Sequence, residues 1–435
     1  MIRITTLLSG HGLAALSTLA RNLVLARILG PQDYGVAVAL VVVIAAAELT
    51  TTLGLPQQIV SHKHGAGRQF QATLHTVQIA RGLLGAGIIL LTATPLANVL
   101  GAPDAAPILR TAALVPTILG FIHLDPFRAQ RHRRHLPQIL VLAVPPMVCV
   151  LAIWPMSGWQ DGPSLMLDLL LVQAFMSVAI SHLIAVRPYR LKFHMSQIQQ
   201  VLRYGLPLAA NGILMFAVLH AEKLIAGAGL GLVEMGVLAM GFTLTLTPAL
   251  IMARSFQAFY LPKLRNEREQ VLGLAMMLGA SLSVVLTTLV PLCLPVLGAG
   301  FGGLAELIPI LSCLAALRLP KSALATVALA EGCTNLPAVA NLPRVLGTPL
   351  VWLALGWGGD VKTLLVIATT AEVAGVGLGI LISRTKQLPV RATAIAALVG
   401  VLVLSGQHGL AIFACGIGWM LYAFSPTPFL TRRTT

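Results

Sequence analysis

The sequence contains few charged residues: they make up 10% of its 435 residues, whereas 57% are apolar. A soluble domain carries about 25% charged residues, because water must solvate most of its surface. Here the charged residues fall in clusters between long apolar stretches. This scarcity excludes a soluble globular protein and predicts an all-α protein that crosses a membrane many times.

Cysteines and catalytic motifs are also scarce. The five cysteines are scattered through the apolar stretches without a CxxC spacing, so they indicate neither a disulfide framework nor a metal site. The chain has no GxSxG, HExxH or P-loop motif, and the predicted external loops are short. We therefore expect no enzymatic activity, no cofactor and no metal.

The apolar stretches are long enough to predict about fourteen (12–14) transmembrane helices, of which the last two are short. The predicted spans are 4–27, 35–59, 72–98, 105–124, 137–155, 164–186, 205–226, 233–254, 270–297, 305–329, 336–356, 361–383, 391–406 and 408–424. Short turns connect nearly all of them.

The loop charges alternate along the chain. The even-numbered gaps contain the basic residues Lys63, Arg68, Arg128, Arg131, Arg133, Arg134, Arg187, Arg190, Lys192, Arg203, Lys263, Arg265, Arg268, Arg384, Lys386 and Arg391. The other gaps contain Asp33, Asp104, Asp161, Glu234, Glu306 and Asp360, with Lys362 as the main exception, and only the gap near Glu331 fails to show the alternation. This positive-inside pattern predicts that both termini are cytoplasmic. It also explains the net charge of +15 without a nucleic-acid partner.

The chain contains an internal repeat. Residues 21–36, RNLVLARILGPQDYGV, align without a gap to residues 222–237, EKLIAGAGLGLVEMGV, with five identical positions. The offset of 201 residues contains six predicted spans, so both halves have the same orientation in the membrane. This predicts two pseudo-symmetric six-helix lobes and a C-terminal helical hairpin. The expected parts are a first lobe 1–186, a cytoplasmic linker 187–203, a second lobe 204–383, and a hairpin with a tail 384–435.

At these span junctions the sequence resembles a known family. LARILGPQDYGVAVAL, residues 25–40, is similar to the N-terminal signature of the polysaccharide-transport (oligosaccharide flippase) family of the multidrug/oligosaccharidyl-lipid/polysaccharide exporter superfamily. AEKLIAGAGLGLVEMGVLAMG, residues 221–241, resembles that family's repeat of the signature, in which Asp usually stands in place of Glu222.

The resemblance implies a multi-pass protein of the bacterial inner membrane. Its expected substrate is a polyprenyl-diphosphate-linked oligosaccharide, which it moves from the cytoplasmic to the outer leaflet for polysaccharide biosynthesis. Membrane lipids, a polysaccharide polymerase and glycosyltransferases are the implied partners.

Several charged residues lie inside the predicted spans, where an ionised side chain is costly and usually faces a bundle interior or a cavity. The basic candidates for substrate binding are Arg21, Arg81, Arg318 and Arg344, together with Arg27, which lies nearer the outer surface. The acidic candidates are Glu48, Glu222 and Glu372. Each of them either forms a salt bridge or takes part in proton or cation coupling, and the sequence leaves both alternatives open.

The excess of buried basic over acidic residues predicts a cationic central cavity suited to an anionic substrate, since arginine binds phosphate oxygens with a planar set of donors. The resemblance assigns the first-span cation to Arg21. Proline and glycine inside the spans permit the lobes to rock between inward-open and outward-open states. Two rival functions remain: a cation-coupled multidrug exporter of the same superfamily, and a membrane enzyme of glycan assembly.

Overall fold

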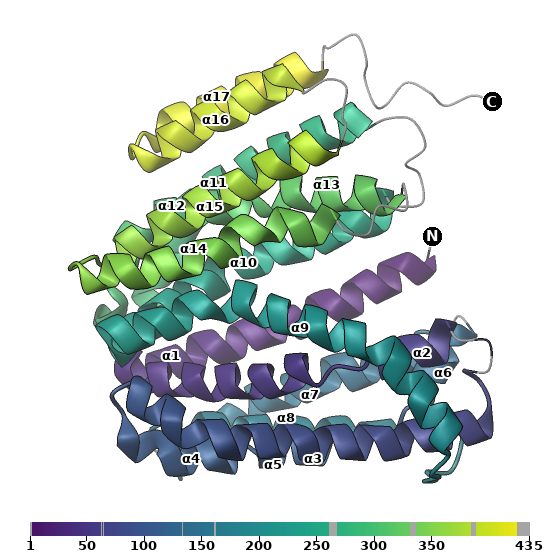
Figure 1. The fold of residues 1–435 in the computed structure, drawn as a ribbon. Coiled ribbons are helices and arrows are strands. Elements are labelled where there is room, and N and C mark those ends of the chain that lie inside the picture. The colour runs from purple at the N-terminus through teal and green to yellow at the C-terminus, as the bar shows by residue number, and fades with distance from the viewer. Residues whose placement is uncertain are drawn as a thin grey trace, which may run out of the picture. The chain divides into compact units, whose positions relative to one another are not determined.

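The computed structural model describes residues 2–61, 63, 65–132, 134–160, 162–260, 268–330, 336–383 and 389–423. The regular elements within these ranges are all helices, as Figure 1 shows. A helix satisfies its own backbone hydrogen bonds, which lipid cannot do, and therefore suits these apolar stretches. The predicted all-α polytopic class is confirmed.

The contacts within the chain define two compact units, Met1–Gly236 and Val237–Thr435. The boundary falls near the start of α10 (Leu232–Tyr260), so the seventh predicted span belongs to the first unit. The division into lobes at residues 186 and 204 stays a prediction.

The first unit is organised around α1 (Ile2–Thr50), which packs along α7, α9 and α3. Its other helices are α2 (Leu55–Ser61), α3 (Arg68–Val99), η1 (Pro103–Ala105), α4 (Ala106–Thr111), α5 (Leu114–Leu119), α6 (Asp125–Arg131), α7 (Leu136–Met156), α8 (Ser164–Leu183) and α9 (Met195–Leu230).

The second unit is organised around α11 (Arg268–Leu297), which packs on α12, α13, α16 and α17. Its other helices are η2 (Ala299–Phe301), α12 (Leu304–Ala316), α13 (Arg318–Ala330), α14 (Leu336–Gly356), α15 (Val361–Ile382), α16 (Val390–Leu404) and α17 (His408–Ala423). The paired helices α16 and α17 form the predicted C-terminal hairpin (Figure 1).

Helices occupy all fourteen predicted spans. Ten described helices are long and apolar enough to cross a membrane. One of them, α1, contains the first predicted span and residues 35–50 of the second, which ends in α2. The predicted span 105–124 consists of the short helices α4 and α5, and α16 and α17 are shorter apolar helices.

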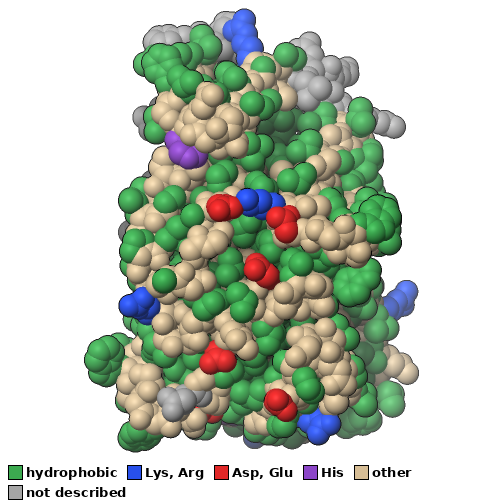
Figure 2. Space-filling model, turned by 90° about the vertical axis from the view of Figure 1, so that its left-hand side faces the viewer, with side chains coloured by type: hydrophobic (Ala, Val, Ile, Leu, Met, Phe, Trp, Pro, Cys, Tyr) green, Lys and Arg blue, Asp and Glu red, His purple; other side chains and the backbone are tan. Residues whose placement is uncertain are grey.

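The surface is rich in large hydrophobic side chains. Leu91, Leu151, Phe175 and Leu292 are each more than 60% exposed, on four different helices. Figure 2 shows one face on which hydrophobic side chains are numerous and charged side chains are few. Lipid chains, rather than water, are the solvent that such a surface requires.

The two aligned motifs have the same backbone geometry. Gly30 (φ 71°, ψ 173°) and Gly231 (φ 105°, ψ 174°) both adopt a conformation that favours glycine, and each separates two helical segments. The next aligned pair packs reciprocally. A Cβ atom on Gly35 would lie 2.1 Å from the Leu232 carbonyl oxygen, and one on Gly236 would lie 2.2 Å from the Pro31 carbonyl oxygen. These contacts support the ungapped alignment.

We predict that Gly35→Ala destabilises the protein by roughly 1–3 kcal/mol, because the added methyl group would clash with a backbone carbonyl that cannot rotate away. Gly87→Ala is the matched control, since a Cβ there meets no atom within 4 Å. Thermal unfolding in detergent measures both. Equal unfolding temperatures for the two variants would contradict the close contact.

Candidate functional site

Arg21 lies in the interior of the first unit, on α1, and is 5% exposed. Its Nη1 donates a hydrogen bond of 2.6 Å to Oε1 of Gln173 on α8, and its Nε and Nη2 donate to Oδ1 of Asn22 at 3.4 and 3.3 Å. These acceptors are neutral amides. Within the described part of the chain Arg21 has no carboxylate partner, so its charge is solvated by dipoles and not neutralised by an ion pair.

Arg81 and Glu48 line a cavity of about 240 Å³ in the same unit, together with Thr51 and Gln78. Arg81 donates from Nη2 to the backbone carbonyl of Glu48 at 3.2 Å and from Nη1 to Gln78 Oε1 at 3.5 Å. The Glu48 carboxylate makes no ion pair with any described residue. It therefore borders the cavity as a polar group that water or a cation could contact.

The second unit contains a buried cluster of charges centred on Glu372, which lies on α15 and is 0% exposed. Three cations lie close to its two carboxylate oxygens: Lys321 Nζ at 3.1 Å, Arg344 Nη1 at 3.2 Å and Arg318 Nη1 at 3.5 Å. The sequence left two alternatives for Glu372, a salt bridge or a role in proton or cation coupling. In the structure Glu372 forms salt bridges. Three cations around one carboxylate leave the four side chains with an excess of positive charge.

Lys321 completes this cluster although it was not among the predicted site residues. It follows Arg318 by three positions on α13, and that spacing places both side chains on one face of a helix. The spacing was therefore a usable signal for Lys321. No sequence signal placed the α14 and α15 residues next to this face.

The cluster borders a cavity of about 200 Å³ that lies within the second unit. Arg318, Lys321 and Arg254 line it, together with the polar side chains of Gln257 and Asn341. Such a basic, polar-lined cavity can bind anions through charge-assisted hydrogen bonds.

The remaining candidates lie elsewhere. Arg27 is exposed on α1, and Glu222 is buried on α9, at 8% exposure, in the first unit. The structure thus brings Arg318, Arg344 and Glu372 together, and brings Arg81 next to Glu48. Whether any of them binds substrate stays a prediction.

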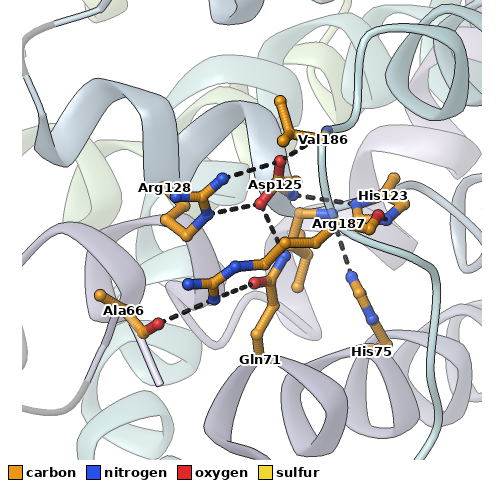
Figure 3. Close-up of polar contacts among 9 residues, drawn as sticks. Ala66, Gln71, His75, His123, Asp125, Arg128, Val186 and Arg187 are labelled. Carbon is orange, nitrogen blue, oxygen red and sulfur yellow. Dashed lines mark hydrogen bonds and ion pairs between the residues drawn. The ribbon is translucent and has the colours of Figure 1, made fainter. Parts of the chain in front are cut away.

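A polar network holds the loops of the first unit together. Asp125 accepts hydrogen bonds from Arg128 Nε at 2.5 Å, Arg128 Nη2 at 3.1 Å and the Val186 backbone N–H at 2.9 Å (Figure 3). Burial alone would raise the pKa of Asp125, but these hydrogen bonds outweigh it and lower the pKa to about 2. The carboxylate is therefore ionised at neutral pH and ties the loop before α6 to the segment after α8.

Two histidines in this network use both ring nitrogens. His123 Nδ1 accepts from the Asp125 backbone N–H at 3.0 Å, so Nε2 carries the proton donated to the Arg187 carbonyl at 2.9 Å. His75 Nε2 accepts from the Leu124 N–H at 3.1 Å, so Nδ1 donates to the Arg190 carbonyl. Both rings are therefore neutral, since a second proton would replace an acceptor with a donor.

We predict that Glu372→Gln destabilises the protein by on the order of 3–5 kcal/mol, because it leaves three buried cations without their carboxylate. Glu306→Gln breaks the exposed Glu306–Lys362 pair and should change the stability far less, because water already screens that pair. Chemical or thermal unfolding in detergent compares the two. Equal losses of stability would show that the buried cluster is not stabilised by its carboxylate.

We predict that acidification through the ordinary histidine range weakens the loop network. A second proton on His123 would place a donor on Nδ1 opposite the Asp125 backbone N–H, so the folded protein favours the neutral ring. The contribution to stability is therefore present above the unfolded-state pKa, about 6.5, and is lost as pH falls toward the lower folded-state value. The ring also faces His75, Tyr189, Asp125 and Arg128.

Thermal unfolding at about pH 7.5 and about pH 5.5 measures this effect, with His123→Gln as the comparison. The unmodified protein should lose more stability on acidification than the variant, which is less stable at neutral pH but lacks the titrating ring. An identical loss in both proteins would exclude His123 as its source.

The fold is shared with solved membrane transporters. A lipid II flippase, MurJ, in an inward closed conformation matches with a TM-score of 0.69 and 10% identity over 96% of this chain and 98% of its own. A multidrug resistance MATE transporter of the MOP superfamily matches in its inward-facing conformation with a TM-score of 0.65 and 15% identity, over 88% of this chain and 95% of its own. Its outward-facing conformation matches with a TM-score of 0.58 and 15% identity, over 90% and 95%.

Sequence comparison gives the family. No curated protein matches the chain significantly. A family model described as polysaccharide biosynthesis protein matches residues 24–325, which is more than half of the chain and includes most of the first repeat motif and all of the second. This match agrees with the resemblance of the span junctions to a polysaccharide family: the chain belongs to the polysaccharide biosynthesis protein family.

Proposed function

We propose that this protein is a flippase that moves a polyprenyl-diphosphate-linked oligosaccharide from the cytoplasmic to the outer leaflet of the bacterial inner membrane. Membership of the polysaccharide biosynthesis family and a fold shared with a lipid II flippase support a transporter of this kind. The observation that carries the substrate class is Arg21, a buried guanidinium whose described partners are neutral amides.

The physical argument concerns the diphosphate. Moving an unpaired anion into a medium of low dielectric constant costs on the order of several kcal/mol, even after the protein relaxes around it. A guanidinium that is already buried and solvated by amides compensates that charge without having to break an ion pair first. When no substrate is bound, the side-chain amides of Gln173 and Asn22 accept hydrogen bonds from Arg21 and solvate its charge.

The other cations have related roles in this proposal. Arg81 in the first unit and the Arg318–Arg344 cluster in the second unit bind diphosphate or acidic sugar groups. The exposed Arg27 binds the same groups nearer the outer surface. Glu372 keeps its cluster in place, because three mutually repelling cations require a carboxylate among them. Glu222 remains a candidate for ion coupling or for a salt bridge.

Transport proceeds by alternating access in this proposal. The solved multidrug transporter of the same fold has inward-facing and outward-facing conformations, and the present chain has proline inside α9, α10 and α12, where helices can bend. Both termini are cytoplasmic, and a polymerase and glycosyltransferases act before and after the transport step.

A cation-coupled multidrug exporter is the second candidate. The likeness to MATE transporters favours it. Glu48 lines a cavity and makes no described ion pair, so its carboxylate could bind a cation there. The two candidates differ in what Glu48→Gln would change. An exporter would lose drug resistance in this variant, whereas a flippase that binds its anionic substrate through arginines would still export surface polysaccharide.

We predict that Arg21→Ala blocks export of surface polysaccharide and causes the lipid-linked precursor to accumulate. A hydrogen bond to a charged group contributes about 1.5–3 kcal/mol. Losing one such bond between Arg21 and the substrate should therefore lower the transport rate roughly ten- to a hundredfold. Arg21→Lys should retain part of the function, because the charge stays while the planar set of donors is lost.

Arg110→Ala is the control, since this arginine is exposed and contacts Thr94 at the surface. Membrane abundance of each variant is measured alongside precursor and polymer. Normal polymer export by an Arg21→Ala protein present at normal abundance would contradict the role of Arg21.

A further inference from the structure

Three chain segments that are far apart in sequence bring arginines to one cavity in the first unit. Arg68 comes from the start of α3, Arg128 from α6, and Arg187 and Arg190 from the segment between α8 and α9. The cavity has a volume of about 320 Å³ and is also lined by Gln71 and His75. All three segments belong to loops that the positive-inside pattern predicts to be cytoplasmic.

The arginines of this cavity are not neutralised equally. Arg128 is held by both oxygens of Asp125. Arg187 instead donates from Nη1 to two neutral oxygens, the Ala66 carbonyl at 2.8 Å and Gln71 Oε1 at 3.0 Å (Figure 3). Within the described chain, Arg68, Arg187 and Arg190 form no ion pair. Among these described residues, the negative charge of Asp125 neutralises only one of the four guanidinium groups, so the cavity has an excess of positive charge.

The walls of the cavity are held in place before anything binds. Asp125 fixes the Val186 backbone, and His75 and His123 bind the carbonyls of Arg190 and Arg187. Arg187 and Arg190 are therefore both anchored through their backbones. The Arg187 guanidinium is held as well, by its hydrogen bonds to Ala66 and Gln71. Such preorganisation lowers the cost of ordering a site on binding.

The charges in the cavity repel one another. Burial lowers the pKa of Arg187, and the neighbouring Arg128 and Arg68 lower it further, while Asp125 opposes them. An anion placed among these groups would relieve that repulsion. Arginine donors arriving from several directions suit a tetrahedral phosphate with its exposed oxygens better than they suit a planar carboxylate.

We propose that this cavity, formed by Arg68, Arg128, Arg187 and Arg190, binds a phosphate group. The cavity volume of about 320 Å³ is about ten times the roughly 30 Å³ that one water occupies, which leaves room for a phosphate or diphosphate with its bound water. Two sources supply this chemistry on a membrane surface: the headgroup of an anionic phospholipid, and soluble phosphate or diphosphate. The site is separate from Arg21 and from the Glu372 cluster, and it does not depend on the proposed substrate.

The test uses the full-length protein in lipid nanodiscs and two probes. The first probe is inorganic diphosphate, titrated by calorimetry into protein in nanodiscs of phosphatidylcholine. The second is phosphatidylglycerol mixed into the nanodiscs, with the number of retained molecules read by native mass spectrometry. The variant is the double substitution Arg68→Gln with Arg190→Gln, because both side chains are exposed and neither makes a described hydrogen bond that holds the fold.

Arg203→Gln is the matched control, since Arg203 is an exposed arginine of the same predicted cytoplasmic set outside the cavity. Diphosphate affinity that falls at least about tenfold in the double variant and not in the control supports the site with soluble phosphate as a source. Retention of phosphatidylglycerol with the same dependence, and without diphosphate binding, supports it with the lipid headgroup as the source. Binding of neither probe, or equal loss in Arg203→Gln, overturns the proposal.

Discussion

A charged side chain inside a membrane has to be compensated, and this constraint accounts for most of the polar structure of the protein. An ionised group in hydrocarbon costs several kcal/mol or more, so each one needs a partner, a polar cavity or a route to water. The chain uses different solutions in its two units. Glu372 collects three cations in the second unit, whereas Arg21 in the first unit relies on the amides of Gln173 and Asn22.

These two solutions have different consequences for binding. A guanidinium surrounded by neutral amides keeps its full charge for an incoming anion, because no carboxylate competes for it. A cluster with three cations and one carboxylate is held together by that carboxylate and still has an excess of positive charge next to a cavity. Both arrangements favour an anionic substrate. Glu48 is the exception, because it places a carboxylate beside a cavity.

Local features of the fold were readable from the sequence because they depend on residues close together in the chain. Apolar length predicts the helices, and the motifs around Gly30 and Gly231 predict equivalent turns, which the structure has in nearly the same conformation. The span 105–124 was less predictable. Its apolar composition suits one helix, but the chain there forms α4 and α5, with Ala112 and Ala113 between them.

Contacts between distant segments could not be read in the same way. Depth in the membrane singled out Arg318, Arg344 and Glu372, but their meeting depends on the packing of α13, α14 and α15. The four-arginine cavity of the first unit arises likewise from loops more than fifty residues apart, and in sequence its arginines look like ordinary positive-inside residues. Charge patterns predict which side of the membrane a loop occupies, and only the fold decides which loops meet.

The central claim is that buried cations in this protein compensate the charge of a diphosphate while it crosses the membrane. The most direct measurement reconstitutes the protein in vesicles and follows the leaflet position of two forms of one lipid-linked oligosaccharide, with and without the diphosphate. The account predicts that the protein moves the diphosphate-linked form and leaves the uncharged form in place. Equal movement of the two forms would contradict it.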